Sequence, residues 1–146
     1  MDFSKFDKQV DLEGLKKDIE DSASNDFKEV PLGSYEVAIT KLELGESSKS
    51  DPMVKVWFKI VSEGEYKGSL IFMNQVITKG FQIHIVDEFL RSLESGVDVH
   101  FESYSQYAEL LADIYKAIEG NYEYALKYGE KKGFNTFEIT EVFELD

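Results

Sequence analysis

The residues best suited to binding chemistry lie in one short segment, residues 53–61, whose alternating pattern predicts a β-strand. One face is apolar, and the opposite face presents Lys55, Trp57 and Lys59. An indole between two ammonium groups suits single-stranded DNA, because a base stacks on the ring and cations neutralise the flanking phosphates. Alternatively, Trp57 covers a helix or the N-terminal arm, with the lysine stems packed around it.

The turn after this strand sets which residues lie beside Trp57. Residues 63–66 predict a two-residue type II′ hairpin with Gly64 at the first central position. This turn would place three pairs of residues opposite each other on the two strands: Trp57 with Phe72, Lys59 with Leu70, and Lys55 with Asn74. A four-residue turn of the same phase would give the same pairs. We therefore expect Trp57 and Phe72 to form a two-ring platform.

Two polar loops supply further cations. Lys49 lies in the Ser-rich and Gly-containing segment 45–51, and Lys131 and Lys132 lie in the turn at residues 130–133. In a five-stranded OB barrel, the loop after strand one and the loop after strand four flank the face of strands two and three. Segments 45–51 and 130–133 would be these two loops. We expect these lysines to contact the DNA backbone; the alternative is that they are ordinary solvated turn residues.

Sequence signals for catalysis or metal binding are missing. The chain has no cysteine, no Gly-rich phosphate loop followed by Lys-Ser or Lys-Thr, and no Gly-x-Ser-x-Gly motif. His84 and His100 are its only histidines, and their spacing is not that of metal ligands. We expect no enzymatic activity, no catalytic residues, no bound metal and no cofactor.

The charge distribution leaves a second function open. The chain of 146 residues has a net charge of −13, yet residues 34–81 hold six acids and six lysines. Residues 82–120 hold eight acids against Arg91 and Lys116, a net −6. A locally neutral or positive groove can still bind phosphate within an acidic protein. The alternative is an acidic interaction module, or a DNA mimic that inhibits a host nucleic-acid enzyme.

The periodicity of the chain indicates a β-rich α+β fold. Residues 1–30 predict an N-terminal helical arm, and residues 31–146 a single OB-fold domain. Strands are expected at residues 35–44, 53–61, 67–77, 122–128 and 134–142, with helices at 81–93 and 107–118. This is the β-β-β-α-β-β order of a five-stranded OB barrel with a helical insertion between strands three and four.

The N-terminal segment bears on location and assembly. No apolar run is long enough to span a bilayer, and the first residues do not resemble a signal peptide, so a cytoplasmic protein without membrane contacts is expected. The apolar stripe of the predicted arm, formed by Val10, Leu12, Leu15 and Ile19, must be buried on its own barrel or on a second copy. A homo-oligomer is therefore one open alternative.

Several segments together resemble a known family. They are Val30-Pro31-Leu32-Gly33-Ser34-Tyr35-Glu36-Val37, Met53-Val54-Lys55-Val56-Trp57-Phe58-Lys59-Ile60, Gly64-Glu65-Tyr66-Lys67-Gly68, Phe89-Leu90-Arg91-Ser92-Leu93 and Gly133-Phe134-Asn135-Thr136-Phe137. The chain resembles the single-stranded-DNA-binding proteins encoded by phages of Gram-positive bacteria, long catalogued as a domain of unknown function. The resemblance implies an OB fold, binding of single-stranded DNA, a role in phage DNA replication or recombination in the host cytoplasm, and partners among replication or recombination proteins.

Overall fold

The computed structural model describes residues 29–146 as five strands and two helices. In chain order these are β1 (Gly33–Glu46), β2 (Pro52–Ile60), β3 (Leu70–Val76), α3 (Gly80–Ser92), α4 (Tyr104–Ile118), β4 (Tyr122–Lys131) and β5 (Phe134–Glu144). The predicted β-rich α+β fold and its element order are confirmed. The predicted N-terminal helical arm lies outside the described residues. No helix in the described part of the chain is long and apolar enough to cross a membrane.

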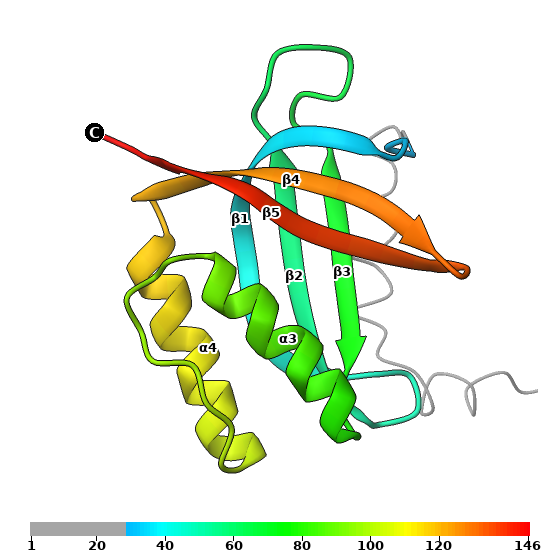
Figure 1. Ribbon diagram of the computed structural model, residues 1–146, viewed down its shortest axis with the longest axis vertical. Helices are drawn as coiled ribbons and strands as arrows, with labels where there is room; N and C mark the ends of the chain where they lie inside the picture. Colours follow the sequence, from blue (N-terminus) through cyan, green and yellow to red (C-terminus); the bar gives the residue numbers. More distant parts are fainter. Residues whose placement is uncertain (1–28) are drawn as a thin grey trace, which may run out of the picture.

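The strands form one antiparallel sheet in the order β3-β2-β1-β4-β5, with β1 at its centre. The first part of β1, Gly33 to Val37, pairs with β4, and the part from Val37 onward pairs with β2. A β-bulge between Ile39 and Lys41 separates buried Ile39 from the next buried residue, Leu42. Because a bulge bends its strand, β1 turns sharply and the β4–β5 hairpin crosses over β2 and β3 (Figure 1).

The sheet is open, and the closed barrel expected from the sequence is not found. Within residues 29–146, β3 and β5 are the two edges of the sheet, and no hydrogen-bonded ladder joins them. Helix α3 packs against both edges, so side chains bridge the gap in place of backbone pairing. Phe58 of β2 stacks on Phe137 of β5 at 5.9 Å between ring centroids, and Phe89 of α3 meets Phe58 edge-on at 5.9 Å.

At the N-terminus of each helix, a side chain accepts hydrogen bonds from the backbone. The side-chain oxygen of Gln82 accepts hydrogen bonds from the backbone of Thr78 and Lys79, both at 3.0 Å, ahead of α3. The hydroxyl of Ser103 accepts one from the backbone N–H of Gln106, at 3.1 Å, at the start of α4. At the other end of α4, the Tyr115 hydroxyl donates to the carbonyl of Thr40 at the β1 bulge, at 3.1 Å. This bond fixes α4 to the bend of the sheet.

Two buried tyrosines donate hydrogen bonds inside the core. The hydroxyl of Tyr107 donates to the carboxylate of Asp87 at 2.5 Å, and that of Tyr124 to the carbonyl of Leu93 at 2.9 Å. Tyr124 lies with Leu126 on the inner face of β4, as the alternation of this strand predicts. Burial raises the pKa of both tyrosines well above 10, and for Tyr107 the hydrogen bond to Asp87 raises it further.

These raised pKa values predict a loss of stability at alkaline pH. Unfolding exposes Tyr107 and Tyr124 to water, where they ionise near their ordinary pKa of 10.0. The folded state keeps both protons, so the stabilisation is complete below about pH 10 and declines as the pH rises above it. Urea unfolding between pH 8 and 11.5 should show this decline.

The matched variant is Tyr107→Phe, which removes one of the two buried hydroxyls. At neutral pH it should cost about 1 kcal/mol through the lost hydrogen bond. Above pH 10 its free energy of unfolding should fall less steeply than that of the wild type. Identical alkaline slopes for the two proteins would contradict this explanation.

Candidate nucleic-acid interface

The four site residues predicted on β2 and β3 lie together on the outer face of the sheet. Trp57 is opposite Phe72, Lys59 opposite Leu70, and Lys55 opposite Asn74, so the predicted register is confirmed. The side chains at alternate positions of β2, including Val56 and Phe58, are buried on the inner face.

The prediction of a two-residue type II′ turn between β2 and β3 is wrong. Residues 61–68 form a longer loop in place of the two-residue type II′ hairpin. The ladder ends at Ile60, whose N–H donates to the carbonyl of Ser69 at 2.9 Å and whose carbonyl accepts from Gly68 at 2.8 Å. The predicted register is nevertheless correct, because Ile60 and Ser69 lie opposite each other as that register requires. Within the loop, the Gly64 carbonyl accepts a hydrogen bond from Lys67 at 3.3 Å.

Trp57 lies in a row of three side chains that crosses three strands. Lys41 of β1 and Phe72 of β3 are its cross-strand neighbours. The Lys41 ammonium lies 4.3 Å from the centroid of the indole, and the Phe72 ring meets the indole edge-on at 5.5 Å with an interplanar angle of 89°. In the described part of the chain, both helices pack on the inner face, and Trp57 is not among the side chains packed against the core. Neither α3 nor α4 therefore covers this ring.

The outer face of β1, β2 and β3 is positive, although the chain carries −13. Lys41, Lys55 and Lys59 share this face with two acids, Glu36 and Glu43, which gives +1 (3 − 2). Glu43 pairs with Lys41 at 3.1 Å. In residues 29–146, neither Lys55 nor Lys59 has an acidic partner within 4.0 Å. Within the described residues, these two ammonium groups are therefore available to an anionic ligand.

A glycine on β1 accommodates one of these lysines. The Lys55 side chain lies over Gly45, where a β-carbon would come within 3.0 Å of its Cε and 3.1 Å of its Nζ. The absence of a side chain at Gly45 thus leaves room for Lys55 to lie along the sheet.

Lys41 was missed as a site residue, although the sequence contains a signal for it. The apolar phase of β1 changes from Val37 and Ile39 to Leu42 and Leu44, because the step from Ile39 to Leu42 is three residues, whereas an unbroken strand has a step of two. Such a change of phase indicates a bulge. Beyond the bulge, Lys41 and Glu43 occupy the outward positions.

Lys49 lies in an ordered loop between β1 and β2. The hydroxyl of Ser47 accepts hydrogen bonds from the backbone N–H groups of Lys49, at 3.3 Å, and Asp51, at 3.1 Å. The Ser47 N–H donates to the Asp51 carbonyl at 2.8 Å, and Ser50 adopts a positive φ of 64°. Hydrogen bonds therefore close this loop on itself, with Lys49 exposed.

Lys131 and Lys132 lie at the tip of the β4–β5 hairpin. Lys132 and Gly133 have φ of 52° and 82°, the positive values that a two-residue type I′ turn requires. Phe134, opposite Lys131, is 77 % exposed and was missed as a site residue, although only Gly133 separates it from the two lysines. The hairpin tip extends past β3 in Figure 1. No hydrogen bond or ion pair within the described residues joins it, or Lys49, to the Trp57 face.

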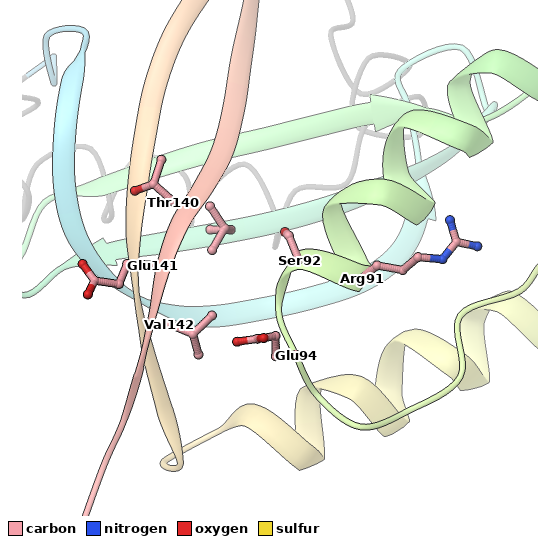
Figure 2. Close-up of a pocket in the computed structure, with 7 residues that line it drawn as sticks. Arg91, Ser92, Glu94, Thr140, Glu141 and Val142 are labelled. Atoms are coloured by element: carbon pink, nitrogen blue, oxygen red, sulfur yellow. The ribbon is translucent and has the colours of Figure 1, made fainter.

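Elsewhere in residues 29–146 the surface has shallow depressions. One of about 320 Å³ lies between the end of α3 and β5 (Figure 2). The Glu94 side chain is directed toward Val142 there, whereas the guanidinium of Arg91 points away and bonds to Glu88 at 2.8 Å. Residues 29–146 contain no group of three or more His, Cys, Asp or Glu side chains placed to hold a metal ion.

Residues 17–115 match the model of a family described as proteins of unknown function, DUF669. The chain belongs to this family. No match was found among curated proteins. The DUF669 match contains β1, β2, β3 and α3, and hence the Trp57 face, and it ends at Tyr115 within α4. The β4–β5 hairpin of this DUF669 protein lies beyond the match.

The positive outer face predicts a charge-selective quenching of Trp57, the only tryptophan of the chain. Iodide should quench its fluorescence more strongly than caesium, because the local potential concentrates anions near the ring despite the negative net charge. Acrylamide, which is neutral, corrects for simple accessibility.

A triple variant, Lys41→Gln, Lys55→Gln and Lys59→Gln, supplies the control. It should bring the iodide-to-caesium ratio to one or below, and added NaCl should reduce the wild-type ratio. A wild-type ratio below one would show that the acidic remainder of the chain dominates the potential at Trp57.

Proposed function

We propose that this protein binds single-stranded DNA on the outer face of β1, β2 and β3. The observation that carries the proposal is the row Lys41–Trp57–Phe72, which places two aromatic rings between the ammonium groups of Lys41, Lys55 and Lys59 on a positive face of an acidic chain. Rings bind bases of any sequence by stacking, worth on the order of 1–3 kcal/mol per base, and lysines neutralise phosphates. Lys55 and Lys59 flank the aromatic pair for this purpose.

The arrangement of the sheet supports an OB-type fold. A strand order of β3-β2-β1-β4-β5 and a bent β1 shared between two halves of the sheet are what an OB barrel has when it is open between its third and fifth strands. OB folds bind oligonucleotides on strands two and three between the two neighbouring loops. In this proposal Lys49, Lys131, Lys132 and Phe134 act from those loops.

The biological role rests on the family resemblance. Because the segments around Trp57 and Phe89 resemble those of single-stranded-DNA-binding proteins encoded by phages of Gram-positive bacteria, we propose the same role here: phage DNA replication or recombination in the host cytoplasm. Replication or recombination proteins are the expected partners. The acidic surface elsewhere would limit nonspecific contact with other polyanions.

A second candidate is an acidic protein-interaction module. Phe81 and Ile85 lie one turn apart on α3 and are 62 % and 47 % exposed; Phe81 directly precedes the acidic stretch 82–120, and Ile85 lies within it. Exposed apolar side chains amid acids suit a basic protein partner. A titration with single-stranded DNA separates the two functions, since only the first requires Trp57 to respond.

Titration of a fluorescein-labelled oligo-dT should show binding at micromolar concentration or below, with quenching of Trp57. Trp57→Ala should weaken this binding. The double variant Lys55→Gln/Lys59→Gln should weaken it too, and should reduce the dependence of log K on log[salt] by about 1.4, at about 0.7 per phosphate contact.

The matched control is Arg91→Gln/Lys116→Gln, which changes the net charge equally but on helices α3 and α4, on the other side of the sheet. It should leave the affinity and the salt dependence close to those of the wild type. Equal losses of affinity in both double variants would show that net charge alone accounts for the effect. No binding of oligo-dT by the wild type would favour the protein-interaction function.

A further inference from the structure

The two rings of the platform are not equally available to a base. Lys41 holds its ammonium over one face of the Trp57 indole, 4.3 Å from the centroid, and the same ammonium lies 3.1 Å from Glu43. A base that stacked on this face would have to displace a cation held by two partners. Trp57 is half-buried, with Phe72 packed against it on the side of β3.

Phe72 is the more accessible ring. It is 48 % exposed, and it lies on an edge strand, so within residues 29–146 no further strand flanks it on its outer side. Its contact with Trp57 is edge-to-face, with an interplanar angle of 89°. Whichever ring contributes the edge, this geometry leaves at least one face of Phe72 uncovered by Trp57.

We propose that a nucleobase stacks on Phe72, and that Trp57 is a positioning residue with Lys41 as its phosphate-binding partner. This inference rests on the proposed binding of single-stranded DNA. Trp57 holds Phe72 edge-on from one side and the Lys41 ammonium from the other. Lys41 and Phe72 are two strands apart, about 10 Å, so one nucleotide segment can place its base on β3 and a phosphate over β1.

The test compares aromatic substitutions by anisotropy of labelled oligo-dT, which needs no tryptophan signal. Phe72→Leu removes the π-surface but keeps an apolar side chain, and should lower the affinity about 5- to 150-fold, the equivalent of about 1–3 kcal/mol of stacking. Phe72→Tyr keeps the ring and should bind like the wild type. Trp57→Phe keeps a ring between Lys41 and Phe72 and should lose less than about 3-fold.

The salt dependence separates stacking from charge. Phe72→Leu should leave the slope of log K against log[salt] unchanged, whereas Lys41→Met should reduce it by about 0.7. Phe81→Leu on α3 is the matched control, since it removes another exposed phenyl ring, and it should bind normally.

Binding by the wild type together with full affinity of Phe72→Leu would overturn this inference and leave the proposed function intact. So would a larger loss in Trp57→Phe than in Phe72→Leu. A wild-type protein that does not bind oligo-dT would overturn the proposed function, and the inference with it.

Discussion

The structure depends on an aromatic column that joins the two halves of an open sheet. Phe89 of α3, Phe58 of β2, Phe137 of β5 and Tyr128 of β4 contact one another in series, with centroids 5.5 to 5.9 Å apart. Because no backbone ladder connects β3 with β5 in residues 29–146, these side chains supply the cohesion that a closed barrel would obtain from hydrogen bonds. Each aromatic pair adds about 0.5–1.5 kcal/mol beyond the area it buries.

The column also fixes the site on the opposite face. Phe58 is fully buried, and successive side chains of a strand point to opposite faces, so Trp57 and Lys59 must point outward. A shift of one residue in the pairing would expose Phe58 and bury Lys59 without a partner, which is strongly unfavourable. Core packing therefore holds a tryptophan and lysines on the surface, where a folded protein gains little from them. That arrangement is explained if the face has a ligand.

Sequence periodicity was sufficient for the strands, the helices and the register of β2 with β3, because each depends on local alternation. It failed where the outcome depends on contacts between distant segments. The closed barrel was wrong because α3 packs between the edge strands, and the tight turn was wrong although its register was right. Lys41 was overlooked because the bulge in β1 changes which residues point outward. The relation of the hairpin lysines to Trp57 depends on the path of β4 and β5, which alternation does not encode.

Photo-crosslinking tests the central claim most directly, because it locates the DNA without altering the protein. An oligo-dT containing 5-iodo-deoxyuridine, irradiated in complex with the protein and analysed by mass spectrometry, should attach to the β2–β3 segment at Phe72 or Trp57. Crosslinks confined to α3 and α4, or none at saturating DNA, would contradict the assignment of the outer face as the DNA-binding surface.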